Sequence, residues 1–212
     1  MRKTDTARII AALADLYPDA VCSLEYGGDP WRLLVAARLS AQCTDERVNI
    51  VCRPLFERFP DAASAAECDI AELEETVRPC GLFRMKAKNI KDMSKMIVDR
   101  FEGRVPDTME DLLSLPGVGR KIANLILGDV FGKGGVVADT HCIRICGRLG
   151  YYPTDKKDPL LTERVMEKAI PRDEQSAFCH RIVAFGREYC TARSPRCGEC
   201  PLAEYCAYPK NV

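Results

Sequence analysis

Apolar residues recur at spacings of three and four positions along most of the chain, which is the pattern of helices that each bury one face. No stretch shows the sustained alternation of a half-buried strand, and VVAD at 136–139 is too short and follows a glycine-rich loop. The sequence therefore predicts an all-α fold. Helices are expected over residues 7–17, 31–43, 45–59, 69–77, 84–101, 108–115, 120–131, 140–149, 159–169 and 174–189.

The composition fits a folded protein of one or two small domains. The chain has 212 residues, 47% of them apolar, which is enough for an ordinary core. It has no run of 18 apolar residues, and its first apolar segment is interrupted by Asp15 and has helical spacing. We therefore expect a cytoplasmic protein without a membrane partner.

Twelve cysteines are many for a cytoplasmic chain, and a secreted disulfide scaffold is the alternative. The lack of an export signal argues against that alternative, and so does a core large enough to be stable without disulfide bonds. Eight cysteines are scattered among mostly apolar neighbours, and we expect them to be small buried hydrophobes. These eight are Cys22, Cys43, Cys52, Cys68, Cys80, Cys142, Cys146 and Cys179.

The formal charge is zero, but it is unevenly distributed along the chain. Residues 61–78 carry six acids and one arginine, residues 84–104 carry seven bases and three acids, and residues 118–150 carry five bases and two acids. The two basic segments are candidates for contact with nucleic acid. A solvated surface of mixed charge is the alternative.

The stretch LPGVGRKIAN, residues 115–124, predicts a short turn between two helices. Gly117 and Gly119 permit positive φ and leave room for the backbone N–H groups around Val118 to approach a partner. N–H groups at a helix N-terminus bind anions, which in nucleic acid are phosphates. A simple tight turn is the alternative, but the whole pattern, about 107–131, resembles the helix-hairpin-helix DNA-binding motif.

Two cations, Arg120 and Lys121, stand in the first turn of the second hairpin helix, where the helix dipole disfavours positive charge. A lysine acts as a nucleophile only as a neutral amine, which the helix end, Arg120 and partial burial would all favour. Lys121 is therefore a predicted nucleophile, and a phosphate contact is the alternative. Asp139, a predicted N-cap, is the candidate carboxylate for the same chemistry, and His141 is a pocket candidate to which the sequence assigns no role.

Four cysteines, Cys190, Cys197, Cys200 and Cys206, are spaced by six, two and five residues near the C-terminus. The segment is too short and polar to fold on its own core, so four thiolates there predict a metal centre. The uneven spacing favours a [4Fe-4S] cluster, with zinc as the alternative. Arg193 lies between the first two cysteines, on a loop that could touch DNA phosphates.

Several motifs occur together in one order, and their combination resembles the endonuclease III family of DNA repair glycosylases. They are LSAQCTD (39–45), GLF (81–83), LPGVGRKIAN (115–124), VADTHCIR (137–144) and the four-cysteine loop. The resemblance implies a helix-hairpin-helix glycosylase fold with a DNA groove between two domains. One would be a barrel of about six helices over 23–132. The other would join 1–22 to 133–212 and carry a [4Fe-4S] cluster on 190–206.

The resemblance also implies a bifunctional DNA glycosylase and AP lyase of base excision repair. Lys121 would displace an oxidised pyrimidine from a flipped nucleotide and form a Schiff base, and β-elimination would nick the strand 3′ to the lesion. Asp139 would be the essential carboxylate, Gln42 would fill the hole left by the flipped base, and Leu82 would wedge the stack. Asp45 and His141 are pocket candidates.

The implied partner is double-stranded DNA with damaged bases or abasic sites, bound by a monomer that is nucleoid-associated when on DNA. A monofunctional mismatch glycosylase is the nearest alternative, and the presence of Lys121 argues against it. A non-catalytic helix-hairpin-helix module is a second alternative, but it gives no reason for Asp139.

Overall fold

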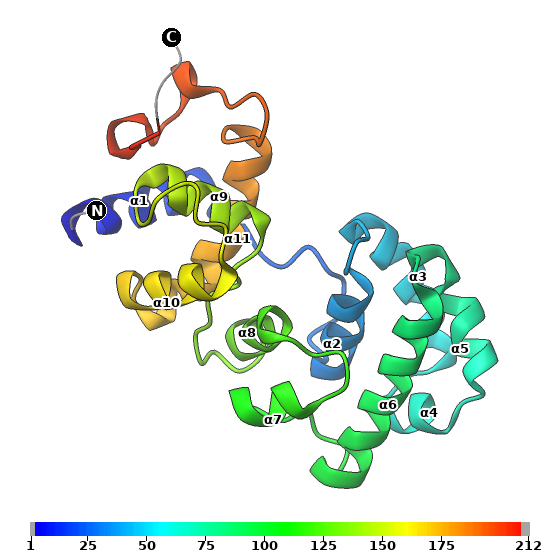
Figure 1. The fold of residues 1–212 in the computed structure, drawn as a ribbon. Coiled ribbons are helices and arrows are strands. Elements are labelled where there is room, and N and C mark those ends of the chain that lie inside the picture. Colours follow the sequence, from blue (N-terminus) through cyan, green and yellow to red (C-terminus); the bar gives the residue numbers. More distant parts are fainter. Residues whose placement is uncertain (1–2, 209–212) are drawn as a thin grey trace. The chain divides into compact units, whose positions relative to one another are not determined.

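The computed structural model describes residues 3–208, and these contain helices and turns but no strand. Within them, no helix is long and apolar enough to cross a bilayer. The chain separates into two compact units with separate cores (Figure 1). We call Cys22–Phe131 the central unit, and the described parts of Met1–Val21 and Gly132–Val212 the terminal unit.

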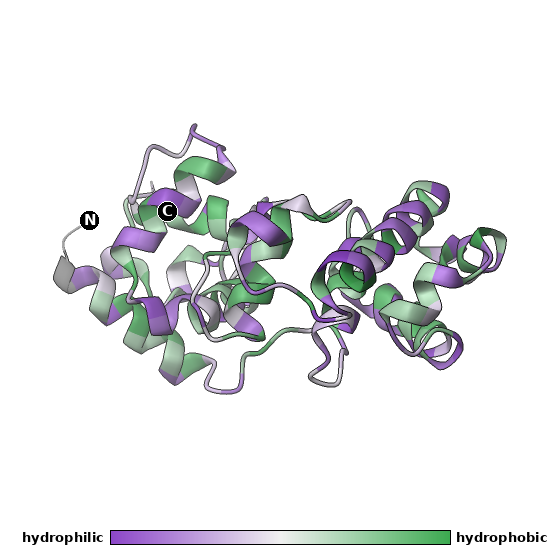
Figure 2. Ribbon diagram, turned by 90° about the horizontal axis from the view of Figure 1, so that it is seen from below, coloured by the Kyte–Doolittle hydropathy of each residue, from purple (hydrophilic) through white to green (hydrophobic). Residues whose placement is uncertain are grey.

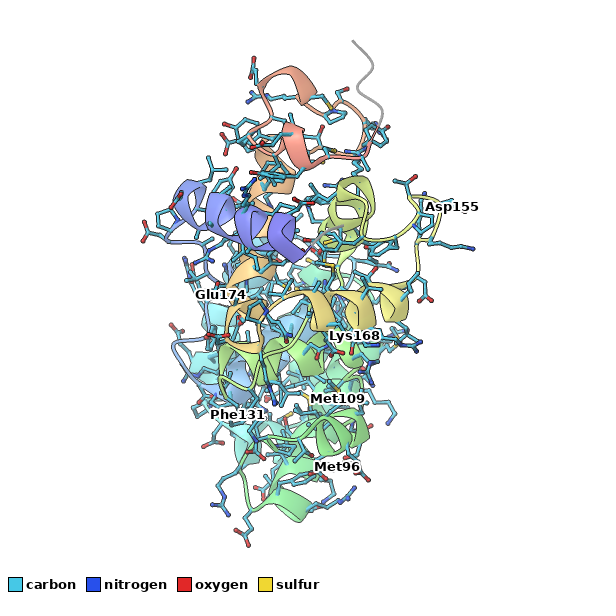
Figure 3. The ribbon with its side chains drawn as sticks, turned by 90° about the vertical axis from the view of Figure 1, so that its left-hand side faces the viewer. Met96, Met109, Phe131, Asp155, Lys168 and Glu174 are labelled. Carbon is cyan, nitrogen blue, oxygen red and sulfur yellow. The ribbon has the colours of Figure 1, made fainter. Side chains whose placement is uncertain are left out.

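Seven α-helices and one 3-10 turn make up the central unit. They are α2 (Pro30–Leu39), α3 (Asp45–Arg58), α4 (Ala62–Glu67), α5 (Ile70–Val77), η1 (Arg78–Cys80), α6 (Phe83–Phe101), α7 (Met109–Ser114) and α8 (Arg120–Asp129). The long α6 packs against α2, α4 and α5, while α8 packs against α2 and α7. Met96 of α6 and Met109 of α7 are labelled in Figure 3, and both pack against the central core.

The terminal unit brings the first helix of the chain together with its last third. Its elements are α1 (Lys3–Leu16), α9 (Thr140–Leu149), α10 (Pro159–Ala169), η2 (Arg172–Glu174), α11 (Gln175–Glu188), η3 (Cys197–Glu199) and η4 (Ala203–Tyr205). Helix α1 packs on α11 and buries Ile9 and Leu13 completely. Figure 2 shows that apolar and polar residues alternate around these helices, as one-sided burial requires.

All ten predicted helices are present, and α9 and α10 have the predicted ends. Helix α4 was not predicted, because AASAAE has no large apolar residue to give a periodic signal. It forms because alanine favours helix and because Asp61 and Ser64 make a reciprocal capping box.

The predicted helix over 31–43 is too long, since α2 ends at Leu39. The next residues form a turn in which the Cys43 N–H donates to the Ser40 carbonyl at 3.0 Å. Within that turn Gln42 has φ 57°, a left-handed conformation that interrupts the helix. Gln42 therefore stands in a strained turn and not at the end of a helix.

Most of the scattered cysteines have the predicted character. All eight are free thiols, of which five are buried and three, Cys22, Cys43 and Cys68, are half-buried. Burial raises the pKa of Cys52 to about 12, which keeps its thiol protonated and unreactive at neutral pH.

Candidate functional site

The turn between α7 and α8 depends on one glycine for two separate reasons. Gly117 has φ +80°, and a Cβ there would lie 2.8 Å from Arg38 Nε and 2.9 Å from the Asn89 side chain. Arg38 donates to Asn89 Oδ1 at 3.0 Å from Nε and 2.8 Å from Nη2. The hairpin turn is thus fixed on a hydrogen-bonded pair from α2 and α6. Gly119 differs, because it is extended at φ −102° and serves as the N-cap of α8.

The other turn residue, Val118, is an anchor for the hairpin. Its side chain is buried in the central core, and its N–H donates to the Leu115 carbonyl at 3.1 Å. That N–H is therefore already used within the turn. Helix α8 begins at Arg120, and its N-cap Gly119 has no side chain to cap it, so the N-terminal end of the helix dipole is exposed here.

Lys121 is the second residue of α8 and its side chain is exposed. The partial burial expected for it is wrong. Its setting still combines the uncapped helix end with Arg120, which is also exposed. The helix behind it is held by buried Ala123 and Ile126, so the amine projects from a rigid element.

In the terminal unit, Asp139 is the N-cap of α9. Its Oδ1 accepts a hydrogen bond from the Cys142 N–H at 2.7 Å, and the residue is half-buried. A cap of this kind fixes the orientation of the carboxylate while it stabilises the helix. One oxygen is used structurally, and the group remains partly accessible.

The two pocket candidates have structural partners. His141 Nδ1 lies 3.2 Å from Arg144 Nη2, and a Cβ on Gly186 of α11 would be only 2.4 Å from this nitrogen. His141 therefore fills the contact between α9 and α11. Asp45, the first residue of α3, accepts from the Ser23 hydroxyl at 2.6 Å and ties down the segment before α2.

Gln42 and Leu82 share an unusual combination of strain and exposure. Apart from glycines, the residues with positive φ in the described chain are these two and Glu102. Leu82 has φ 48° and is 53% exposed, and Gln42 is also exposed. Such backbone conformations cost about 1–3 kcal/mol each and gather at functional sites. Both residues therefore qualify as functional candidates on geometry alone.

Leu82→Gly is expected to raise the free energy of unfolding of the central unit by about 0.5–1 kcal/mol. Relief of left-handed strain is worth about 1–2 kcal/mol, and the greater flexibility of glycine offsets about 0.5–1 kcal/mol. Urea unfolding followed by the fluorescence of Trp31, the single tryptophan and a core residue of this unit, measures it. Leu82→Ala keeps the strain and should give no gain. Equal stabilities of both variants would contradict the strain.

The C-terminal loop brings four free, half-buried thiols into one neighbourhood. Burial raises the pKa values of Cys200 and Cys206, and in both cases Cys190 and Cys197 add to the effect because their charges interact. Four mutually repelling sulfurs become stable thiolates only with a cation among them. No group of three or more His, Cys, Asp or Glu residues within 3–208 is arranged for a single metal ion. The donor set suits a larger iron-sulfur cluster.

Sequence reasoning missed Arg148, which holds both ends of this loop. Arg148 is 8% exposed, and its guanidinium donates to the carbonyls of Thr191 and Ala192 at 2.8 and 3.1 Å, and to Cys190 Sγ at 3.3 Å. Its own carbonyl accepts the N–H groups of Ala207 and Tyr208. The available signal was an arginine at a core-facing position of α9, next to Leu149. Arg193, in contrast, is exposed on the loop.

Comparisons with known proteins identify the family of the chain. Residues 35–172 match the HhH-GPD superfamily of base excision DNA repair proteins, and residues 190–206 match the iron-sulfur binding domain of endonuclease III. Endonuclease III of Synechocystis sp. is 48% identical over 206 residues, which cover 97% of this chain and 93% of that protein. The chain belongs to the endonuclease III family.

Solved structures of endonuclease III have the same fold. A non-covalent endonuclease III–DNA complex and a trapped endonuclease III–DNA covalent intermediate each match with a TM-score of 0.91 and 39% identity, over 98% of this chain and 96% of theirs. As a member of the endonuclease III family, the chain is a bifunctional DNA glycosylase and AP lyase of base excision repair with an iron-sulfur cluster. The predicted fold, activity and cofactor are confirmed, and zinc and the non-catalytic alternative are wrong.

Proposed function

We propose that Lys121 is the nucleophile of this member of the endonuclease III family. The observation that carries the proposal is an exposed lysine in the first turn of an uncapped helix. The hairpin that carries this helix is fixed, because its turn packs closely at Gly117 on other side chains of the central unit. Its neutral amine attacks C1′ of the damaged nucleotide as the bond from C1′ to the base breaks. The resulting N,O-acetal at C1′ opens when the C1′–O4′ bond breaks and O4′ takes a proton, which leaves a Schiff base between C1′ and the lysine nitrogen. Loss of a C2′ proton then breaks the C3′–O bond and nicks the strand. A relative trapped as a covalent intermediate with DNA supports a covalent step.

The hairpin is also the proposed contact with the DNA backbone. Gly117 leaves the turn free of a side chain, and the uncapped end at Gly119 attracts a phosphate through N–H groups and the helix dipole. The Arg120 side chain is exposed at the same helix end. These contacts position the duplex without reading its sequence. The chain thus binds damaged double-stranded DNA through the phosphates of the DNA backbone.

We assign Asp139 to charge stabilisation in the same reaction. Because Oδ1 caps α9, the carboxylate is held in one orientation. We propose that Oδ2 faces the sugar of the bound nucleotide. A fixed negative charge favours the positive charge that develops on the sugar ring as the base leaves.

Gln42 and Leu82 are the proposed side chains that enter the duplex when the damaged nucleotide leaves the stack. An apolar wedge such as Leu82 unstacks a base step, and an amide such as Gln42 can bond to the unpaired base. Leu82→Gly should therefore lose base release while gaining stability. This combination is the signature of strain that serves function.

Cys190, Cys197, Cys200 and Cys206 are the proposed ligands of the cluster, and Arg193 is a proposed phosphate contact beside it. Cys200→Ser should remove most of the iron from the purified protein and lower its thermal stability, since cluster binding supports folding of the loop. Cys68→Ser is the matched control, because Cys68 is equally half-buried but lies in the central unit. Full iron content in Cys200→Ser would remove this ligand from the set.

The substrate class we propose is an oxidised pyrimidine in duplex DNA, acted on by a monomer in the cytoplasm at the nucleoid. A panel of duplexes, each with one oxidised pyrimidine, one oxidised purine, a uracil or a mismatch, tests it. Release of the oxidised pyrimidine with a nick 3′ to the site is expected. Faster release of any of the other bases would contradict this substrate class.

A further inference from the structure

One lysine of the central unit is completely buried and has no part in the chemistry above. Lys86 on α6 is 0% exposed. Its Nζ donates to the carbonyl of Leu39 and to the carbonyl of Cys80, both at 2.8 Å. Burial lowers the pKa of Lys86, so its charge is costly to keep in this place.

The two carbonyls have the same structural position. Leu39 is the last residue of α2, and Cys80 is the last residue of η1. Carbonyl groups at the end of a helix, or of a 3-10 turn such as η1, lack partners within that element. A single ammonium group therefore satisfies two helix ends at once. An apolar side chain of the same size would leave both carbonyls unpaired.

Each of these helix ends leads directly into a strained turn. Gln42 follows Leu39 by three residues, and Leu82 follows Cys80 by two. Left-handed residues of this kind persist only where the surrounding structure holds them. The Lys86 side chain donates hydrogen bonds to the residues at which both turns start, Leu39 and Cys80, and so joins the two turns.

Lys86 joins α6 to the end of α2, and a second pair of polar side chains joins the same two helices. Asn89, three residues after Lys86 on α6, accepts two hydrogen bonds from Arg38, the residue before Leu39. Gly117 of the hairpin packs on this pair. The last turn of α2 therefore connects the hairpin turn and both strained turns to one face of α6.

We infer that Lys86 is a positioning residue that sets the distance between Gln42 and Leu82, so that both side chains enter the duplex together. The inference rests on the insertion proposed for these two residues. It predicts that Lys86 matters for steps that open a duplex and does not matter for chemistry on a strand that is already open.

The test compares Lys86→Met with Ser94→Ala, a control on the same helix. Ser94 is also fully buried and accepts from Trp31 Nε1 at 2.9 Å, but it touches neither strained turn. Two activities are measured for each: base release from a duplex with one oxidised pyrimidine, and lyase activity on single-stranded DNA with an abasic site. Misplacement by about 1 Å can cost about 10²-fold, so Lys86→Met should lose about that factor in kcat/KM on the duplex. Its single-strand lyase rate should stay at the wild-type level.

A 2-aminopurine placed opposite the lesion gives a readout that a general loss of stability does not change. Its fluorescence rises on binding when the opposite nucleotide leaves the stack, and Lys86→Met should abolish the rise at saturating protein. Lys86→Gln, which retains two donors but is shorter, should show a partial rise, and it serves if the methionine variant does not fold.

An unchanged ratio of duplex to single-strand activity in the Lys86 variants would overturn the inference, as would an equal fall of that ratio in Ser94→Ala. The proposed function fails separately, if the wild-type protein releases no base from the duplex.

Discussion

Lys121→Ala is expected to abolish the covalent adduct that borohydride traps between this protein and DNA with an abasic site. Borohydride reduces a Schiff base to a stable amine, and only a lysine or N-terminal amine can form that Schiff base. Adduct formation should therefore fall below detection on a denaturing gel. The fold should not change, because an exposed lysine is replaced by a residue that favours helix.

The neighbouring Arg120 provides the matched control. Arg120→Ala removes a cation from the same helix end and should weaken DNA binding, with a flatter dependence on salt. The amine remains, so the adduct should still form at saturating protein. An adduct of wild-type yield in Lys121→Ala would show that a different amine is the nucleophile. Loss of the adduct in both variants at saturation would point to a binding defect.

The helical architecture was predictable because its signals are local. Turn residues separate segments of clear 3.6-residue period, and α9 and α10 begin and end at the residues that this pattern predicts. The end of α2 was not predictable in this way. Ser40 and Gln42 carry no glycine or asparagine signal for a left-handed turn, and only the tertiary structure holds Gln42 at φ 57°.

The reactive residues of the candidate site were proposed from motifs, whereas their supports were missed for a physical reason. Pattern analysis assigns cations to solvent, yet Lys86 stands four residues before buried Ile90 on the core-facing side of α6. A charged residue at a core position was the available signal. The contact of His141 with Gly186 of α11 was also not predictable, because it joins residues that are distant in sequence.

Charge counts along the chain were similarly incomplete. The basic segment 84–104 suggested a surface for nucleic acid, but much of its charge is neutralised within the segment itself. Lys88 and Lys95 pair with acids four residues on, and Arg104 pairs with Glu102. With Lys86 buried, the proposed DNA contacts depend on a few positioned groups and not on the net charge of the segment.

Asp139→Asn is expected to reduce base release from a lesion duplex by about 10²–10³-fold, the range measured when one group that stabilises transition-state charge is removed. The substitution removes the charge and little else. Asparagine is as good an N-cap as aspartate, so its side-chain oxygen can still accept from the Cys142 N–H and α9 should remain capped. Thermal unfolding should therefore be close to that of the wild type.

Two further variants separate charge from capping. Asp139→Ala loses both and should cost about 1 kcal/mol of stability in addition to activity. Asp158→Asn makes the same chemical change at the N-cap of α10, where the carboxylate accepts from the Leu160 N–H at 2.9 Å, and should leave base release unchanged. Trapping on DNA that already lacks the base should persist in Asp139→Asn, because no base has to leave. Wild-type base release in Asp139→Asn would contradict the catalytic role of Asp139 and leave it only the role of capping α9.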